Sequence, residues 1–482
     1  MTSSERQSGS KGLPMAKQHV RPDDIRDLFS RAMSDMYRAE VPQYQTLLEL
    51  VADVNAETLR HNARLRAELE RTGEIERLAV ERHGAIRLGT AEELFNIRRV
   101  FATMGMQPVG YYDLSAAGLP VHSTAFRPVT EEGLRHNPFR IFTSLLRLEL
   151  IDDLELRDQA AEILAARRVF TPRTLELVDL SQTEGGLTRV QAEEFVREAL
   201  ETFRWHKNAT VDLATYQKLH KANRLIADII SFNGPHINHL TPRTLDIDAV
   251  QSTMPRRGIA PKAVIEGPPR RNCPILLRQT SFKALEEQIL FRKGAGEMAP
   301  GTHAARFGEI EQRGVALTSK GRDLYDTLLA AARRDVRIEG ADRNSFTYES
   351  RLSERFRSFP DDWDELRRSG LAFFRYSATA AGVASKPLTL LPITAEELIA
   401  RGFLRFDPIV YEDFLPASAA GIFQSNLGND EKKLYDIQSS QEQFEAALGI
   451  AVRNELELYA QAERVSLEVA LTQLGPPYDG VV

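Results

Sequence analysis

The stretch that decides the fold is His239-Leu-Thr-Pro-Arg-Thr-Leu-Asp-Ile-Asp248, an extended segment that passes directly into a helix start. An earlier stretch has the same order: His83-Gly-Ala-Ile-Arg-Leu88 is followed by the capping box Thr90-Ala-Glu-Glu93. Each helix ends at a glycine, Gly105 in the first copy and Gly258 in the second, and glycine is the usual residue at that position. The two stretches therefore predict two supersecondary units of the same kind, each opening with a histidine.

Further strands follow both helices. In the first unit, Val109–Tyr112 and Val121–Phe126 read as strands and give a βαββ order. In the second, the expected strands are Ala263–Glu266, Ile275–Thr280 and Ala305–Arg313. The sequence thus predicts an α+β fold whose core is a pair of βαβββ-like modules that form a curved sheet.

The remaining chain is mostly helical by its apolar spacing. One long polar helix is expected over Asp430–Leu474, and Pro42 is expected to divide two N-terminal helices, followed by a third over Asn55–Arg71. The expected organisation is a disordered tail at 1–20, a helical region at 21–80, the first module at 81–130, an inserted helical block at 131–230, the second module at 231–320, and a C-terminal mixed and helical region at 321–482 that completes the active site.

Composition narrows the class of protein. The 482 residues include 62 Lys and Arg against 68 Asp and Glu, and this net charge of −6 argues against a protein that binds nucleic acid through phosphate contacts. The single cysteine, Cys273, excludes a disulfide within the chain and suits a reducing cytoplasm. No apolar run is long enough for a membrane span, so we expect a cytoplasmic protein without membrane partners.

Three residues are candidate metal ligands. His83 and His239 hold equivalent places in the two modules, and Glu309 lies on a later strand. Two imidazoles and one carboxylate on one side of a metal suit non-haem Fe(II) oxygen chemistry. Glu311 shares a face with Glu309 and is the rival carboxylate, whereas His236 would face the other side of a strand and is interpreted as structural.

Several blocks carry a family resemblance. The second module and the Phe307–Arg313 strand resemble hydroxyphenylpyruvate dioxygenases, of the vicinal oxygen chelate superfamily. The chain resembles more closely the 2-oxoadipate dioxygenase/decarboxylases, also called hydroxyglutarate synthases. The blocks that carry this second resemblance are Val41–Val54, Arg82–Arg87, Asn238–Ile247, Met254–Gly258, Phe307–Gly314 and Tyr411–Phe423.

The resemblance implies a chemistry and a set of site residues. It places iron ligands at His83, His239 and Glu309, the substrate arginine at Arg87, and substrate contacts at the neighbouring pair Ala417 and Ser418. These residues would bind Fe(II), O₂ and a 2-oxo dicarboxylic acid. The implied reaction converts 2-oxoadipate and O₂ to 2-hydroxyglutarate and CO₂ in lysine breakdown, with both oxygen atoms entering the organic product.

Strand geometry agrees with the place of Arg87. Residues four apart on a strand share a face, so Arg87 and His83 would point the same way. Its guanidinium would offer a planar fork to a substrate carboxylate. The competing interpretation is a surface ion pair between Arg87 and Glu92 or Glu93.

Two other functions remain open from the sequence. One is a redox-neutral isomerase or lyase that uses Zn²⁺ or Ni²⁺ on the same scaffold, and O₂ consumption separates it from an oxygenase. The other is a non-catalytic binding protein, which would purify without stoichiometric iron. The oligomeric state is not predicted.

Overall fold

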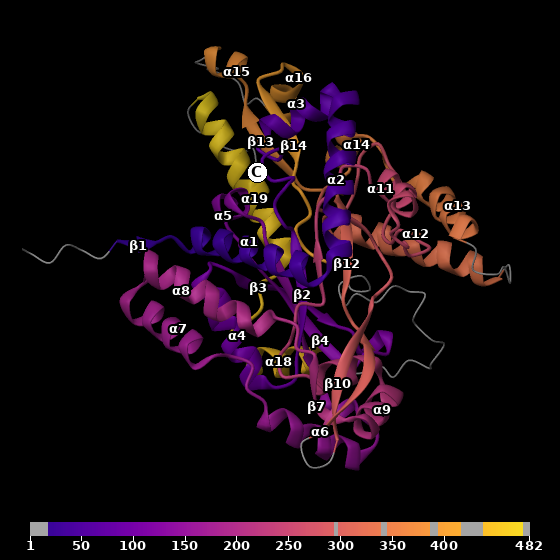
Figure 1. Ribbon diagram of the computed structural model, residues 1–482. Helices are drawn as coiled ribbons and strands as arrows, with labels where there is room; N and C mark the ends of the chain where they lie inside the picture. Colours follow the sequence, from indigo (N-terminus) through magenta and orange to yellow (C-terminus); the bar gives the residue numbers. More distant parts are fainter. Residues whose placement is uncertain (1–17, 294–296, 339–344, 386–393, 416–436, 476–482) are drawn as a thin grey trace, which may run out of the picture.

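A seven-stranded mixed sheet forms the centre of the protein (Figure 1). The computed structural model describes residues 18–293, 297–338, 345–385, 394–415 and 437–475. Across the sheet the strands run in the order β3, β4, β5, β2, β8, β12, β9. The first four belong to one module and the last three to the other, so β2 and β8, the two strands that open with histidine, lie side by side.

The first module has the expected order and one additional strand. It comprises β2 (His83–Leu88), α4 (Ala91–Thr103), β3 (Gln107–Asp113), β4 (Val121–Arg127) and β5 (Arg140–Leu146). The Thr90 hydroxyl accepts a hydrogen bond from the Glu93 amide at the start of α4, and Gly105 follows the helix with φ +70°. Strand β5 lies inside the range expected to be helical, and it completes the βαβββ unit by pairing with β2 and β4.

The second module departs further from expectation. It comprises β8 (His239–Thr241), α11 (Ile247–Thr253), β9 (Leu277–Ser281) and β12 (Phe307–Arg313). Asp246 caps α11, and Gly258, with φ +72°, ends the short 3₁₀ turn that follows. The expected strand at Ala263–Glu266 is wrong: that segment contributes only an isolated bridge between Glu266 and Gln279.

A hairpin that the sequence analysis did not predict precedes β12. It is formed by β10 (Glu286–Lys293) and β11 (Glu297–Ala304), and β7 (Asn208–Asp212) extends it to three strands. The last residues of the expected tail form β1 (His19–Val20), which pairs with β6 (Leu187–Thr188).

The N-terminal region forms three helices, of which the second packs on the second module at α11 and β12. Pro42 separates α1 (Pro22–Glu40) from α2 (Pro42–His61), as predicted, whereas the third helix, α3 (Ala63–Arg71), starts later than Asn55. The buried Tyr37 hydroxyl of α1 donates to the carbonyl oxygens of Asn238 and Phe307, which fixes the helix against the starts of β8 and β12. The helices α5–α10 lie between β4 and β8 along the chain: α5 (Glu131–His136), α6 (Leu154–Ala166), α7 (Pro172–Glu184), α8 (Arg189–Leu200), α9 (Leu213–Ala222) and α10 (Arg224–Ile230).

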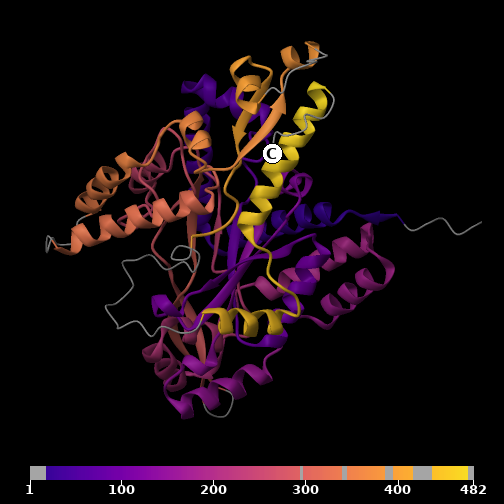
Figure 2. The same cartoon turned by 180° about the vertical axis from the view of Figure 1, so that it is seen from behind.

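The C-terminal region follows the second module along the chain. Its elements are α12 (Ser319–Ile338), α13 (Ser345–Arg355), α14 (Trp363–Arg368), β13 (Phe374–Ala378), α15 (Ala380–Ala384), α16 (Ala395–Ala400), β14 (Leu404–Pro408), α18 (Ile437–Leu448) and α19 (Glu455–Leu474). The single long helix expected at Asp430–Leu474 is wrong, because Gly449, with φ +79°, ends α18 and Asn454 caps α19. Figure 2 shows these two helices, in yellow, running in different directions.

The sheet and its flanking helices confirm the expected fold class, an α+β protein with a core of two related modules. Among the described residues, no helix is both long enough and apolar enough to cross a membrane.

Candidate metal centre

The three candidate ligands come from neighbouring strands. His83 opens β2, His239 opens β8, and Glu309 lies on β12. In the β2–β8 pair His239 is opposite Ala85, and in the β8–β12 pair it is opposite Phe307. Since paired residues share a face of a sheet and side chains alternate along a strand, all three ligands point to the same face.

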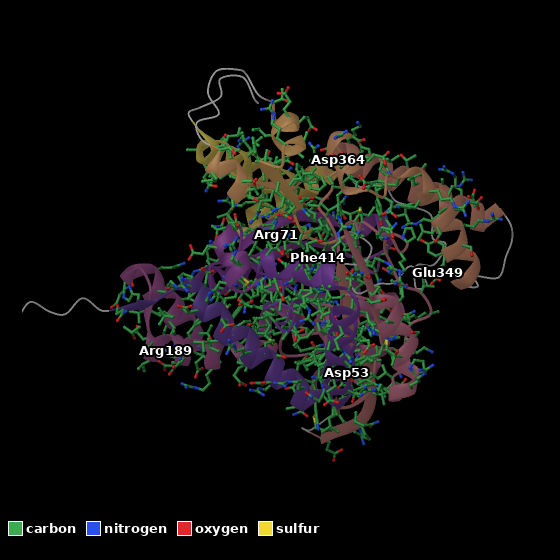
Figure 3. The ribbon with its side chains drawn as sticks, turned by 90° about the horizontal axis from the view of Figure 1, so that it is seen from above. Asp53, Arg71, Arg189, Glu349, Asp364 and Phe414 are labelled. Atoms are coloured by element: carbon green, nitrogen blue, oxygen red, sulfur yellow. The ribbon has the colours of Figure 1, made fainter. Side chains whose placement is uncertain are left out.

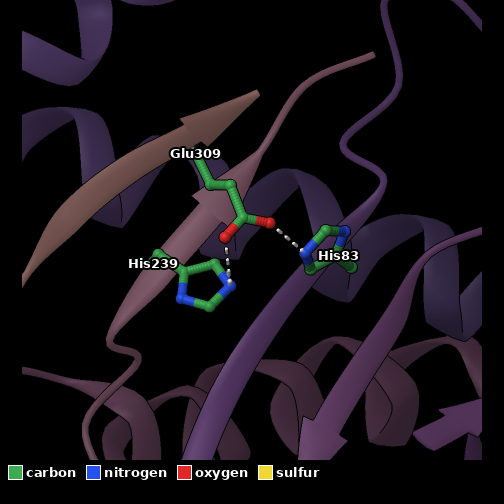
Figure 4. Close-up of side chains that lie close together, drawn as sticks. All are labelled: His83, His239 and Glu309. Atoms are coloured by element: carbon green, nitrogen blue, oxygen red, sulfur yellow. Dashed lines mark hydrogen bonds and ion pairs between the residues drawn. The ribbon is translucent and has the colours of Figure 1, made fainter. Parts of the chain in front are cut away.

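The side chains meet at a buried point. The Glu309 carboxylate lies between the imidazoles, with Oε1 3.0 Å from His83 Nε2 and Oε2 3.9 Å from His239 Nε2 (Figure 4). One ligand atom from each of the three residues lies within 4.8 Å of the others, and all three side chains are buried. Two ligand atoms at right angles, each about 2.1 Å from one ion, would be about 3 Å apart. This group could therefore hold a metal ion.

The donor set also fits a metal. Burial, together with the charges of His83, Arg87 and Lys262, lowers the pKa of His239 well below its usual range. The imidazole is then neutral and can donate a nitrogen lone pair. The buried Nδ1 of His239 has no hydrogen-bond partner within the part of the chain that the structure describes. Two neutral nitrogens and one carboxylate are a ligand set found in non-haem iron sites.

Glu311 was the alternative to Glu309 as the carboxylate ligand, but it lies on the other side of the His83 ring. Its Oε2 lies 2.9 Å from His83 Nδ1, the nitrogen that faces away from Glu309. The Arg313 guanidinium donates to both Glu311 oxygens, at 2.5 and 2.8 Å. Glu311 thus holds the His83 ring from behind, as carboxylates that support metal-bound histidines do.

Neighbouring charged groups set the ionisation of Glu311 and His83. Burial works against the ionised form of Glu311, yet the charge of Arg313 and the contact with His83 hold its pKa well below the usual range. Burial alone would lower the pKa of His83, but hydrogen bonds to Glu309 and Glu311 raise it. Glu311 is consequently an anion that favours a proton on His83 Nδ1 and leaves Nε2 directed at Glu309.

Neighbouring side chains complete the enclosure. The Gln279 amide donates to Glu309 Oε1 from β9. The ring of Phe307 stacks on His239 with centroids 4.8 Å apart, and Phe414 packs edge-on against His83 at the same separation. Figure 3, seen from above, places Phe414 near the middle of the molecule. These contacts bury the ligand group, so electrostatic interactions there are stronger than at the surface.

Arg87 lies on the ligand face but has a partner that the sequence analysis did not anticipate. His239 is diagonal to Arg87 across the β2–β8 pair, a relation that places two residues about 7–8 Å apart. Arg87 Nη1 donates to Asp228 Oδ2 at 2.6 Å. The expected alternative, an ion pair with Glu92 or Glu93, is wrong in this structure: Glu93 instead accepts from Arg167, and Glu92 is exposed.

Other sequence candidates lie away from the ligands. His236 contacts Asp228 at 3.3 Å and packs edge-on against Trp205, in agreement with a structural role. Ala417 and Ser418 lie outside the described residues. Asp228 and Gln279 were not predicted as site residues, because no motif marks either residue.

The fold and the buried His-His-Glu group define an α+β protein of two related modules with a candidate metal centre between them. The profile of the family described as 2-oxoadipate dioxygenase/decarboxylase matches residues 29–426. The chain belongs to this family.

Two named relatives and one solved structure are similar to this chain over most of its length. The chain is 58% identical over 459 residues to the 2-oxoadipate dioxygenase/decarboxylase of Pseudomonas putida KT2440, covering 95% of this chain and 98% of that protein. It is 58% identical over 447 residues to that of Escherichia coli K12, covering 93% and 98%. The crystal structure of the Pseudomonas putida hydroxyglutarate synthase in complex with 2-oxoadipate superimposes with a TM-score of 0.87 at 57% identity, covering 95% of this chain and 100% of that one.

Proposed function

We propose that this protein is an Fe(II)-dependent dioxygenase/decarboxylase that converts 2-oxoadipate and O₂ to 2-hydroxyglutarate and CO₂. The observation that carries the proposal is the buried group of His83, His239 and Glu309 on one face of the sheet, in a chain of the 2-oxoadipate dioxygenase/decarboxylase family. The equation balances: CO₂ takes the carboxyl carbon next to the keto group, and both atoms of O₂ are accounted for in the products.

The residues of this chain have separate tasks in this reaction. His83, His239 and Glu309 would hold the iron from one side and leave its other side for substrate. Iron, when bound, supplies chelation of the keto acid and the redox chemistry with O₂. Glu311 keeps His83 in one tautomer, and Gln279 fixes one oxygen of Glu309. The aromatic rings of Phe307 and Phe414 limit access of water to the ligands.

Arg87 is proposed to bind the distal carboxylate of the substrate. An unpaired carboxylate in a largely desolvated pocket is costly, so a substrate with two carboxylates needs a fixed cation besides the metal. Arg87 is on the ligand face and diagonal to the ligand His239 across the β2–β8 pair, so it is close to the reacting centre. Its remaining N–H groups suit a planar carboxylate.

The cellular setting follows from the same resemblance. We infer that the enzyme acts in lysine breakdown, as the family resemblance implies. A reducing cytoplasm suits the free, buried thiol of Cys273.

One assay tests the proposal. The protein is stripped of metal, reconstituted anaerobically with Fe(II), and mixed with 2-oxoadipate and O₂ in an oxygen electrode. We expect equal amounts of O₂ consumed, CO₂ released and 2-hydroxyglutarate formed, and no turnover by Zn(II)-loaded protein or by His83→Ala. Decarboxylation that continues without O₂, or equal activity with Zn(II), would contradict the oxygenase function.

A further inference from the structure

Asp228 is a buried carboxylate that reaches Arg87 from outside the sheet. It lies on α10 and uses both oxygens: Oδ2 accepts from Arg87 Nη1 at 2.6 Å, and Oδ1 accepts from His303 Nε2 at 2.9 Å. Asn238, the residue before the ligand His239, donates to Oδ2 at 3.4 Å. A single side chain therefore links the proposed substrate arginine to the strand that carries a metal ligand.

The carboxylate is itself held firmly. His303, on β11, accepts through Nδ1 from the Tyr216 hydroxyl of α9 at 2.9 Å. The Trp205 ring stacks parallel to His303, with an interplanar angle of 9°, and packs edge-on against His236, which also contacts Asp228. Contacts from several elements thus fix Asp228, whereas Arg87 has a long side chain with many rotamers.

This arrangement matters because Arg87 would otherwise have to be ordered on binding. Immobilising a flexible side chain when a ligand binds costs affinity, and a partner that holds it beforehand removes that cost. Asp228 occupies Nη1 and leaves the other N–H groups of the guanidinium for a second carboxylate. It also balances the charge of Arg87, which is largely buried at 11% side-chain exposure.

We propose that Asp228 is the positioning residue for Arg87, and that the chain from Tyr216 through His303 to Asp228 sets the selectivity for a 2-oxo acid with a distal carboxylate. The proposal rests on the proposed function of Arg87. It predicts an effect on binding of the dicarboxylic acid and little effect on the metal or on an acid that lacks the distal charge.

The test compares 2-oxoadipate with 2-oxohexanoate, an acid of equal length without the distal carboxylate, on iron-loaded protein. We expect Asp228→Ala to retain its iron and to raise KM for 2-oxoadipate at least tenfold, with kcat reduced less than threefold. KM for 2-oxohexanoate should change less than twofold. Asp228→Asn, which keeps an oxygen for Arg87, should recover part of the loss.

A matched control is Asp248→Ala. Asp248 pairs with Arg278 at 2.7 and 3.0 Å, and Arg278 precedes Gln279 on β9, so it points to the face opposite the ligands. This variant removes a comparable ion pair and should leave the ratio of kcat/KM between the two acids unchanged.

The outcomes separate this inference from the proposed function. Wild-type protein that does not turn over 2-oxoadipate would contradict the function itself. Active wild type with an Asp228→Ala variant whose ratio between the two acids is unchanged would overturn the role of Asp228. If Asp228→Ala does not fold, Tyr216→Phe decides: a two- to fivefold rise in KM for 2-oxoadipate alone supports the proposal, and no change overturns it.

Discussion

We expect replacement of Arg87 to separate substrate recognition from metal binding. Losing one partner of a buried charged pair costs about 3–5 kcal/mol, which corresponds to roughly 10²- to several 10³-fold in kcat/KM. We expect Arg87→Ala to keep its iron and to lose activity on 2-oxoadipate by this amount. Arg87→Lys should recover only part, because an ammonium lacks the planar fork.

The control for Arg87→Ala is a second substrate, 2-oxohexanoate, which lacks the distal carboxylate. 2-Oxohexanoate should be a poor substrate for the wild type and should lose much less on Arg87→Ala. Steady-state kinetics with both acids measures the ratio. A variant that discriminates between them as strongly as the wild type would show that Arg87 does not bind the distal carboxylate.

Glu311 tests how the residues behind the ligands support the metal. Glu311→Gln removes the negative charge that faces His83 Nδ1 and keeps the size of the side chain. Groups of this kind typically contribute 10- to 100-fold in metal affinity. We expect iron affinity, measured by competition with a chelator, to fall by that factor, whereas Glu309→Ala should abolish iron binding. If the iron affinity of Glu311→Gln equals that of the wild type, Glu311 does not support the metal site.

Only those site residues that lie in repeated or recognisable sequence patterns could be predicted from the sequence. His83 and His239 occupy equivalent places in two similar stretches, and Glu309 lies in a strand with a recognisable pattern. Asp228 could not be found in this way, because it is 141 residues from Arg87 and lies on a helix without a motif. Side-chain partners of this kind follow from how the helices pack on the sheet, which residue pattern alone does not specify.

Among the secondary-structure elements, the strands that could be predicted from the sequence were those bounded by turn residues or marked by alternating apolar and polar residues. Strand β5 is as fully buried as β4, which was predicted, but it was missed because it lies inside the range 131–230 that was assigned as helical as a whole. In β11, Pro300 and Gly301 resemble turn residues, yet they pair with β10. The break between α18 and α19 lies between Gly449, which ends the first helix, and Asn454, which caps the second.

The contact between α2 and β12 depends on a small residue at Gly308. A Cβ atom there would lie 2.4 Å from a Phe282 ring carbon, 2.8 Å from Leu47 and 2.9 Å from Tyr44. Overpacking of a buried site costs about 1–3 kcal/mol. We expect Gly308→Ala to lower the free energy of unfolding by this amount and to shift Glu309, its neighbour, so that iron affinity also falls. Urea unfolding with a midpoint equal to that of the wild type would contradict this packing.

For the whole molecule, Glu412 joins the segment after β14 to the sheet. It accepts from Arg140 of β5 and is buried among Arg77, Arg82 and Arg313 as well. Burial opposes its ionisation, but these arginines, Arg140 foremost, hold its pKa below the ordinary 4.5. We expect Glu412→Gln to lose about 3–5 kcal/mol of stability at pH 7, because it leaves the buried Arg140 guanidinium without its carboxylate partner.

The pH dependence of this loss has a definite sign. A carboxylate whose pKa is lowered by folding stabilises the protein above its unfolded pKa and loses that contribution as the pH falls. The difference in unfolding free energy between wild type and Glu412→Gln should therefore be constant near neutrality and shrink as the pH drops below 4.5. Denaturant unfolding across this range measures it, and a difference that grows on acidification would refute the charge balance assigned to Glu412.

We expect one iron ion between the two modules, held by His83, His239 and Glu309. Anomalous diffraction at the iron absorption edge, from crystals of Fe(II)-loaded protein grown anaerobically, tests it most directly. We expect one peak per chain, about 2.0–2.2 Å from a nitrogen of each histidine and an oxygen of Glu309. A peak bound by Glu311 or His236 instead, or no peak in protein that turns over 2-oxoadipate, would contradict it.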